Sequence, residues 1–325
     1  MSLFSRRTIL SGAAAAFAVE ATSSRAQLGS RAMRIIVPWP PGGITDVVGR
    51  VLAQRMGVEL GQTIIVDNRP GASGTLGHGI VAQAAPDGYT LLVGTNSTYA
   101  MAPYLFEKLP YDQEKQLTPI GLVVRSPQFL CAHPSVPVKT FADYLAYVRA
   151  RQPDGVSFES SGPGSSSHLA AELLMALGNF RMLHVPYRGG GPALQALIAG
   201  QVNVGFVDAV VALPMAASDK IRLLAVSTTD RVAEAPQVPT IAESGLAGFQ
   251  SSTDISMFAP AGMAPDLVKK ISGAMLNALK SPDVRDALVK QGAIIVGGTP
   301  EEFPAYYKAE TAKWSKIIRD RGIKM

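Results

Sequence analysis

The sequence predicts an α/β protein of two lobes with a hinge that the chain crosses twice. Strands and helices alternate as βαβαβ at the start of the mature region, an order that implies a parallel sheet with right-handed crossovers. About 300 residues follow the N-terminal export segment, and a chain of this length commonly divides into two cores. The strand pattern indicates that the chain leaves the first lobe and later returns, an arrangement common in domains that close around a ligand.

Residues 1–26 have the pattern of a twin-arginine-type export signal. Arg6 and Arg7 precede an apolar run, and a small-x-Ala cleavage site ends at Ala26. The run is shorter than the roughly 20 apolar residues that span a membrane. We therefore expect a periplasmic protein that is cleaved near Ala26.

The first strand, over 33–37, runs into a turn rich in proline and glycine that opens an amphipathic helix. The first N–H groups of a helix lack intrahelical partners and lie at its positive dipole end, which favours anions. Gly42 and Gly43 remove the Cβ atoms that would keep a ligand away from this backbone. An ordinary strand-to-helix turn is the alternative. The candidate ligand-binding residues here are Trp39, Pro41, Gly42, Gly43, Thr45 and Asp46.

The rest of the first lobe follows in order. Gly61 ends the first helix, a second strand covers 63–67, and a loop over 68–75 opens the second helix. A third strand over 90–93 leads into a loop that contributes Ser97. We include Ser97 as a candidate because open α/β sheets bind ligands at the carboxyl ends of their strands.

The second lobe contains another turn of the anion-binding type. It follows a strand over 156–159 and opens a helix with Leu169 and Leu173 on its apolar face. Two such helix N-termini on different lobes would form a clamp for a carboxylate. The candidate residues in this turn are Ser161, Gly162, Gly164, Ser165, Ser166 and His168.

The remaining elements complete both lobes. A third glycine-rich turn over 186–192 contains Tyr187 and opens a helix over 193–199, and a strand over 202–207 ends at Asp208. A strand over 255–259 returns to the first lobe, which the C-terminal helices with Trp314 and Ile318 should complete. We place lobe 1 at 27–126 and 252–325 and lobe 2 at 127–251.

Several candidates have a structural alternative. We favour a structural role for Asp46, because acidic residues are preferred in a first helical turn. We expect one serine of 165–167 to cap its helix. His168 could donate to a carboxylate or bond within its lobe, and Trp39 and Tyr187 could enclose a ligand or only pack.

Asp208 is our candidate for polar recognition in the second lobe. It would select a ligand with an amine or hydroxyl group, and its alternative role is to cap the helix that follows it.

Charge and metal-ligand patterns exclude several function classes. Without residues 1–26 the formal charge falls from +5 to +3, and no dense Lys or Arg stripe indicates nucleic-acid binding. The lone Cys131 matches no disulfide or redox spacing, so we interpret it as a small buried apolar residue. His78, His133 and His184 show no metal-ligand spacing. We expect neither a metal nor a cofactor.

Three rival functions were weighed against ligand capture. Gly162-x-Gly164 begins a dinucleotide fingerprint, but Ser167 replaces the third glycine and no acidic residue lies near Met182. No serine lies in a G-x-S-x-G elbow, which argues against a secreted hydrolase. We therefore expect no enzymatic turnover. A sensor that presents its ligand to a signalling receptor would share the binding chemistry and stays open.

Five spaced motifs occur in one order along the mature chain: Trp39-Pro40-Pro41-Gly42-Gly43 with Asp46, Asn68-Arg69-Pro70-Gly71-Ala72-Ser73-Gly74, Ala85-Pro86-Asp87-Gly88-Tyr89-Thr90-Leu91, Pro186-Tyr187-Arg188-Gly189 and Thr299-Pro300-Glu301-Glu302-Phe303. In these motifs the sequence resembles the periplasmic binding proteins of tripartite tricarboxylate transporters, also called Bug proteins or extra-cytoplasmic solute receptors.

The resemblance implies a Venus-flytrap fold with a mostly parallel sheet in each lobe. It also implies that the loops at 39–46 and 161–166 hold a small organic carboxylate, partly through backbone N–H groups and water. The receptor would hand this solute to a two-subunit inner-membrane permease, and we expect a monomer. One segment departs from the family: members often have Trp followed two residues later by Gly before the return strand, whereas this chain has Ser252-Thr253-Asp254-Ile255-Ser256.

Overall fold

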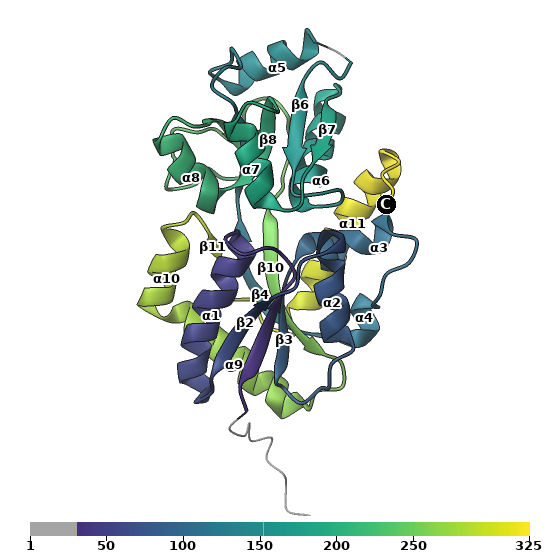
Figure 1. Cartoon of the computed structure of the whole chain (residues 1–325), viewed down its shortest axis with the longest axis vertical. Coiled ribbons are helices and arrows are strands. Elements are labelled where there is room, and N and C mark those ends of the chain that lie inside the picture. Colours follow the sequence, from purple (N-terminus) through teal and green to yellow (C-terminus); the bar gives the residue numbers. More distant parts are fainter. Residues whose placement is uncertain (1–30, 152) are drawn as a thin grey trace, which may run out of the picture.

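The computed structural model describes residues 31–151 and 153–325, so the expected export signal at 1–26 lies outside the described residues. Two α/β lobes follow one another along the long axis of the molecule (Figure 1), which confirms the predicted fold class. Each lobe is built on one β-sheet with buried apolar side chains on both faces.

The sheet of the first lobe has the strand order β11-β4-β10-β3-β1-β2. These strands are β1 (Met33–Val37), β2 (Ile64–Asn68), β3 (Thr90–Thr95), β4 (Leu117–Ser126), β10 (Thr253–Pro260) and β11 (Ile294–Ile295). One face packs against α1 (Ile44–Leu60), α9 (Pro265–Lys280) and α10 (Pro282–Val289). The other packs against α2 (Thr75–Ala82), the helical turn η2 (Ser97–Met101) and α11 (Phe303–Asp320). The short elements η1 (Ala72–Gly74), α3 (Ala102–Leu105) and α4 (Gln113–Gln116) complete the lobe.

The sheet of the second lobe has the order β7-β6-β8-β5-β9. These strands are β5 (Gln128–Ala132), β6 (Ser157–Ser160), β7 (Leu183–Pro186), β8 (Val204–Asp208) and β9 (Arg222–Val226). One face packs against α5 (Phe141–Arg149) and α6 (Ser166–Gly178), the other against α7 (Gly190–Ile198) and α8 (Ala209–Ala217). Cys131 is fully buried in this sheet, which confirms its interpretation as an apolar core residue.

Both sheets are mixed, whereas we expected them to be mostly parallel. The βαβαβ core is parallel as predicted, with β1 between β2 and β3, and β6 lies parallel to β7 and β8. Antiparallel pairs come from β10 and from the β4–β11 pair in the first sheet, and from β5 in the second. The reason is topological: β5 carries the chain away from the boundary between the lobes, so it runs opposite to β8, which ends at that boundary.

Ser227 links the two crossing segments of the hinge. The first crossing passes from β4 through Pro127 into β5, and the second enters β10 after Ser251. The Ser227 hydroxyl accepts the N–H of Gln128 at 3.0 Å and donates to the Ser251 carbonyl at 2.7 Å. Both crossing segments are therefore hydrogen-bonded to one buried side chain.

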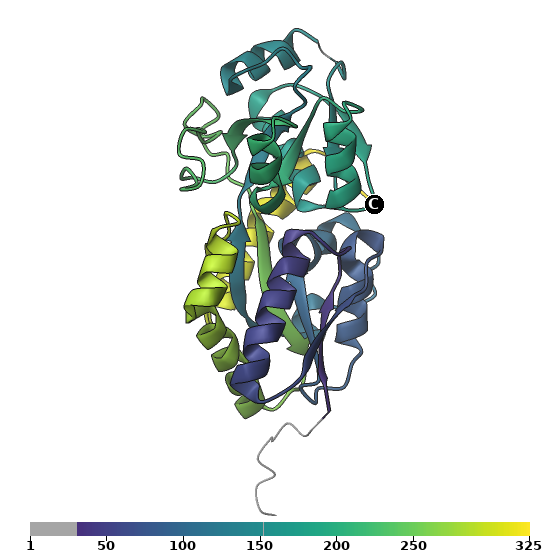
Figure 2. The same cartoon turned by 60° about the vertical axis from the view of Figure 1, so that its left-hand side comes forward.

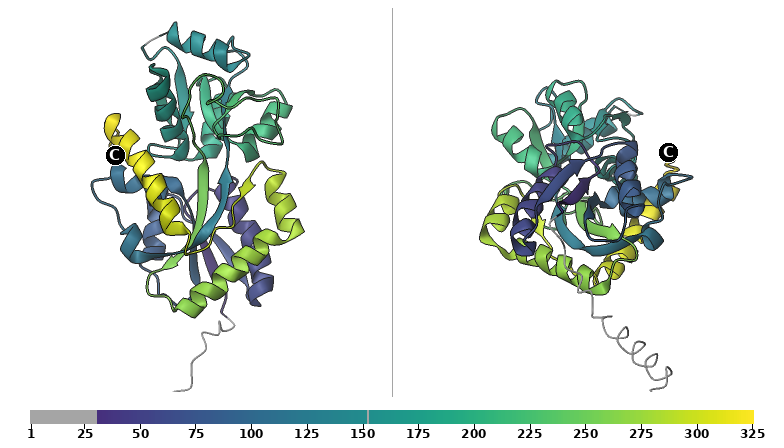
Figure 3. Two further views of the ribbon diagram at one scale, coloured as in Figure 1. Left: turned by 180° about the vertical axis from the view of Figure 1, so that it is seen from behind. Right: turned by 60° about the horizontal axis from the view of Figure 1, so that its bottom comes forward.

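The C-terminal helix differs from our expectation, because it belongs to both lobes and not to the first alone. Phe303 at its start packs with Tyr99 and Phe258 of the first lobe. Trp314 and Ile318 are buried in the core of the second lobe. Figure 3 shows α11, in yellow, running alongside the region where the lobes meet. The sequence pattern identified an apolar helix face, but the pattern does not say which sheet that face covers.

The turns singled out in the sequence lie where the lobes face each other. β1 runs toward the second lobe, so the turn after it and the start of α1 lie at the boundary (Figure 2). β6 and β8 of the second lobe end at the same boundary, where α6 and α8 begin (Figure 1). The fold thus brings helix N-termini from both lobes to one place.

Candidate functional site

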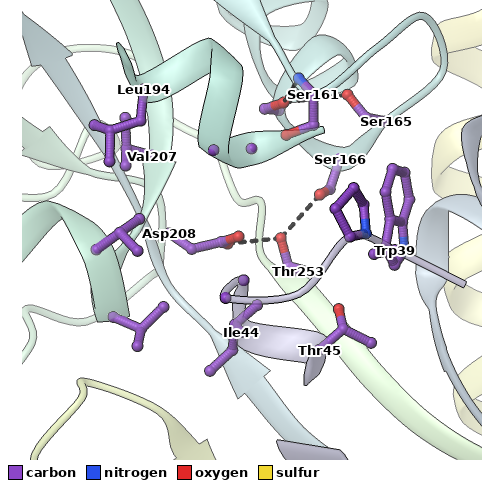
Figure 4. Close-up of a pocket in the computed structure, with 18 of the residues that line it drawn as sticks. Trp39, Ile44, Thr45, Ser161, Ser165, Ser166, Leu194, Val207, Asp208 and Thr253 are labelled. Atoms are coloured by element: carbon purple, nitrogen blue, oxygen red, sulfur yellow. Dashed lines mark hydrogen bonds between the residues drawn. The ribbon is translucent and has the colours of Figure 1, made fainter. Parts of the chain in front are cut away.

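A cavity of about 320 Å³ lies between the two lobes (Figure 4). The first lobe contributes the turn from Trp39 to Thr45, and Thr253 of β10 lies between the lobes. The second lobe contributes the ends of its central strands and the starts of α6, α7 and α8. In Figure 4, Ser161, Ser165 and Ser166 lie above the cavity and Ile44 and Thr45 below it.

Seven backbone N–H groups at three helix N-termini beside the cavity have no hydrogen-bond partner among the described residues. They belong to residues that line the cavity and have no hydrogen-bond acceptor within residues 31–151 and 153–325. These are the N–H groups of Gly43, Ile44 and Thr45 at α1, Ser166 and Ser167 at α6, and Gly190 and Gly191 at α7. No Lys, Arg or His side chain in the described part of the chain lines the cavity. Positive electrostatic potential in the cavity therefore comes from the N-terminal ends of helix dipoles and not from cationic side chains.

Asp46 holds the first-lobe turn in shape and does not line the cavity. Its carboxylate accepts the N–H of Gly42 at 3.0 Å, the Arg50 guanidinium at 3.0 Å and the Asn68 amide at 2.9 Å. Burial raises the pKa of Asp46, but these three hydrogen bonds outweigh it and hold the pKa below its ordinary value. The ionised carboxylate therefore holds in place the loop that carries the unpaired N–H groups of Gly43 and Ile44.

Trp39 forms one wall of the cavity. Its indole N–H donates to the Thr95 hydroxyl at 3.1 Å, and this hydroxyl lies 2.7 Å from that of Ser97. Thr95 lines the cavity, whereas Ser97 lies behind it and is fully buried. Ser97 therefore orients the wall but does not reach the space.

The second-lobe turn is held by hydroxyl groups. Ser165 is the N-cap of α6, and its side chain accepts the N–H of His168, so the expected capping serine is confirmed. The hydroxyl groups of Ser166 and Thr253 lie 2.8 Å apart, and Thr253 donates to Asp208 at 2.8 Å. Because the Thr253 hydroxyl donates its one proton to Asp208, the Ser166 hydroxyl must donate to Thr253. Figure 4 shows these two hydrogen bonds as dashed lines.

His168 forms a hydrogen bond within its lobe, which was the alternative to ligand contact. Its Nδ1 accepts the N–H of Gly164 at 3.1 Å, and its ring stacks on that of His184 at 4.0 Å. Burial, with a smaller contribution from His184, lowers the pKa of His168 to about 3. The ring is therefore neutral and does not line the cavity.

Three further expected residues lie outside the lining. Tyr187 packs beside the apolar core under α7 and α8. Gly162 has φ +129° and Gly164 has φ +73°, and a Cβ on Gly164 would lie 2.7 Å from Cδ1 of Leu105, a residue that does not line the cavity. These two glycines determine the backbone shape of the turn, and its serines line the cavity. Of the expected residues, those in the lining are Trp39, Pro41, Gly42, Gly43, Thr45, Ser161, Ser165, Ser166 and Asp208, and those outside are Asp46, Ser97, Gly162, Gly164, His168 and Tyr187.

Acidic and amide side chains at the end of the second sheet also line the cavity. Asp208 does not cap α8 with its side chain, although it occupies the N-cap position. Burial raises the pKa of Asp208 to about 6 and that of Glu159 to about 8, the latter with a contribution from the Asp208 charge. Glu159 and Gln128 were not among the expected site residues, because each belongs to a short, largely apolar strand and we expected contacts from the turns beside the strands.

The two lobes touch at the edge of the cavity. The Ser73 hydroxyl of the first lobe donates to the Pro163 carbonyl of the second at 2.8 Å. A Cβ on Gly189 would lie 2.9 Å from Pro40 Cγ, so the third glycine-rich turn approaches the first-lobe turn closely. The sequence predicted that turn, but its Gly190 and Gly191 were not among the expected site residues.

Neither a metal centre nor a membrane span is found in the described residues. No group of three or more His, Cys, Asp and Glu side chains there is arranged to hold a metal ion. None of the helices between residues 31 and 325, residue 152 aside, is both long and apolar enough to cross a bilayer.

Comparisons with known proteins agree with this geometry. Residues 48–323 match the family model described as tripartite tricarboxylate transporter family receptor. A solved structure of an R. palustris protein with adipate is 31% identical, covers 90% of this chain and 98% of its own, and has a TM-score of 0.87. MatC from Rhodopseudomonas palustris with bound malate is 35% identical with a TM-score of 0.84, and 90% of this chain and 100% of that chain are covered.

A third structure is that of the periplasmic binding protein BugD. It is 31% identical, covers 91% of this chain and 99% of its own, and has a TM-score of 0.86. The chain therefore belongs to the tripartite tricarboxylate transporter family of receptors, the Bug family of periplasmic solute-binding proteins, which bind and do not convert their solutes.

Proposed function

We propose that this receptor captures a small organic carboxylate between its lobes and delivers it to a two-subunit inner-membrane permease. The observation that carries the proposal is the set of seven unpaired N–H groups around one cavity. Such groups are strong donors to a carboxylate, and the surrounding helix dipoles favour negative charge.

The energy available fits reversible capture. A hydrogen bond to a charged group contributes about 1.5–3 kcal/mol. Four or five such bonds at the upper end of this range supply about 12–15 kcal/mol, which leaves the roughly 8 kcal/mol of micromolar affinity after an association cost of about 4 kcal/mol or somewhat more. Because the donors are backbone groups that do not titrate, the anion-binding part of the site has no proton to lose near neutral pH.

Relatives support the class of ligand. The structures with adipate and with malate are both of dicarboxylate complexes, and both chains share this fold over 90% of its length. Export by the twin-arginine-type segment at 1–26 is part of the proposal, as is a monomeric mature protein. Lobe 1 comprises 27–126 and 252–325, with the end of its last helix also packed on the second lobe, and lobe 2 comprises 127–251. The position of Pro127 between β4 and β5 supports the first boundary.

A carboxylate panel tests the proposal. The mature chain is screened by thermal shift against adipate, malate, succinate, glutarate and amino acids, and hits are measured by calorimetry. We expect at least one carboxylate to bind with micromolar or better affinity and its methyl ester to bind at least tenfold more weakly. Equal binding of acid and ester, or no binding across the panel, would contradict carboxylate capture.

A further inference from the structure

Asp208 is an acidic side chain that remains accessible from the cavity. It lines the cavity and is half-buried, whereas Glu159, the other acidic residue of the described lining, is only 2% exposed. The two also lie on opposite faces of the second sheet, because Asp208 continues the face of Phe206 and Glu159 alternates with Phe158. Asp208 is therefore the acid that a solute in the cavity would meet.

The elements packed around Asp208 present polar or apolar side chains and no cation. Thr253 of β10 donates to the Asp208 carboxylate at 2.8 Å and itself accepts from Ser166 of α6 (Figure 4). Gln128 is the register partner of Asp208 on β5, and α8 continues with Val210 on the cavity side. Among the residues that the structure describes, no Lys, Arg or His side chain lines the cavity. No side chain of the described lining therefore neutralises the Asp208 charge.

Titratable groups on the neighbouring strands and helices do not supply a counter-ion either. Arg125 of β4 forms its ion pair with Asp254 at 3.4 Å. Burial, with a smaller contribution from His184, lowers the pKa of His168 of α6 to about 3, so this ring is neutral. The N-terminal dipole of α8 favours an anion at its N-cap position. The positive potential at Asp208 is therefore that of helix dipoles.

Burial makes Asp208 an unusually weak acid, and a bound anion would make it weaker. Burial raises the pKa of Asp208 from 3.8 to about 6, although the polar side chains of Thr253 and Ser126 act in the opposite direction. At pH 7 the group is therefore mostly ionised in the absence of solute. A carboxylate at the helix N-termini brings a second negative charge into the same cavity, and a nearby like charge raises the pKa of a carboxyl group. An ionised Asp208 and a bound carboxylate thus disfavour each other.

We propose that the receptor takes up one proton together with its solute, and that Asp208 binds this proton. The proton comes from solvent and adds to Oδ2 of Asp208, because Oδ1 accepts the hydrogen bond from Thr253. The complex then carries one negative charge less than the separate protein and solute. This inference rests on the proposed function, because the coupling requires an anionic solute. A solute with its own ammonium group would neutralise Asp208 without a proton.

Calorimetry of the mature chain with the tightest carboxylate of the panel measures this proton directly. Titrations at pH 7 in buffers of different ionisation enthalpy give the number of protons taken up, and we expect roughly 0.5–0.9 per bound solute. Because binding takes up protons, affinity should be roughly five- to tenfold weaker at pH 8 than at pH 6.5. Saturable binding without proton uptake would overturn the inference and leave carboxylate capture standing. If no carboxylate binds, both fail.

Two variants assign the proton to Asp208. Asp208→Asn keeps an oxygen for Thr253 but cannot titrate, so uptake at pH 7 should nearly vanish and affinity at pH 8 should rise. Thr253→Val removes a hydrogen bond that favours the ionised form, so maximal uptake should move to higher pH; it serves as the test should Asp208→Asn fail to fold, as judged by circular dichroism. The exposed Asp266→Asn is the control and should keep wild-type uptake. Wild-type uptake in Asp208→Asn, or its loss only in Glu159→Gln, would overturn the assignment.

Discussion

Removing one backbone N–H from the cavity is the sharpest perturbation that the fold permits. Ser166 is the first residue of α6, and its N–H has no partner within the described residues. Proline is tolerated at the first helical position, because the N–H lost there makes no intrahelical bond. The preceding residue, Ser165, has φ −68° and ψ 162°, the extended conformation that a following proline requires. Ser166→Pro should therefore fold.

The matched control is Ser166→Ala, which keeps the N–H. Both variants lose the hydroxyl that lies 2.8 Å from Thr253, so the ratio of their affinities isolates the backbone donor. One hydrogen bond to a carboxylate is worth about 1.5–3 kcal/mol, which corresponds to a roughly 10- to 160-fold weaker affinity for Ser166→Pro than for Ser166→Ala. The proline ring also occupies the position of the N–H hydrogen, and this acts in the same direction.

Calorimetry with the tightest carboxylate of the panel measures the ratio. Circular dichroism and the melting temperature show that both variants are folded. If Ser166→Pro binds within threefold of Ser166→Ala, the α6 N-terminus does not hold the ligand and the account of the second-lobe turn is refuted.

Three further predictions concern stability. Burial raises the pKa of Glu159 from 4.5 to about 8, so the folded protein keeps a proton there that the unfolded chain has lost, and this group should lower stability by up to about 1.4 kcal/mol per pH unit as the pH rises from 6.5 to 8. His78, His168 and His184 have pKa values of about 3 to 4 in the folded protein and about 6.5 in the unfolded chain, so they raise stability at the start of this window in wild type and variant alike. The difference between the wild-type and Glu159→Gln stabilities, measured by urea unfolding, should therefore fall with pH by that amount; parallel curves would exclude Glu159 as the source. Gly164→Ala should lower the free energy of unfolding by about 1–3 kcal/mol, as measured with urea. The control Gly61→Ala should lower it less, because Gly61 has a similar φ of +63° but nothing within 4 Å of an added Cβ. An equal loss in both variants would show that the Leu105 contact is irrelevant. Asp46→Ala should lower the free energy of unfolding by about 1–3 kcal/mol and weaken ligand binding, because the turn after β1 loses the hydrogen bonds that hold it. Unchanged stability and unchanged affinity would mean that Asp46 does not hold this turn in shape.

Local sequence signals predicted the turns well, because each depends on a few neighbouring residues. The helix starts, the Gly61 stop with φ +63° and the Ser165 cap follow from proline, glycine and serine chemistry at one position. That helix N-termini of both lobes lie at one cavity could also be foreseen, since the carboxyl ends of neighbouring parallel strands meet at one edge of each sheet.

Features that depend on distant contacts could not be read from the sequence. His168 lies in the same helical turn as the capping serine, yet its ring stacks on that of His184 from another strand. Glu159 reaches the cavity only because Gly205, on another strand, leaves space. Trp314 and Ile318 show an apolar helix face whose partner sheet is set by the tertiary fold. In each case the deciding neighbour is remote in the chain.

The backbone amide resonances of the mature protein test the central claim most directly. In ¹⁵N–¹H correlation spectra recorded during titration with the tightest carboxylate, the account predicts a large downfield proton shift for at least one amide at the start of each of the three helices, because that amide becomes hydrogen-bonded to a carboxylate. The amides concerned are those of Gly43, Ile44, Thr45, Ser166, Ser167, Gly190 and Gly191. Saturable binding that leaves the resonances of these amides unshifted, while those of other amides shift, would contradict carboxylate binding at the helix N-termini.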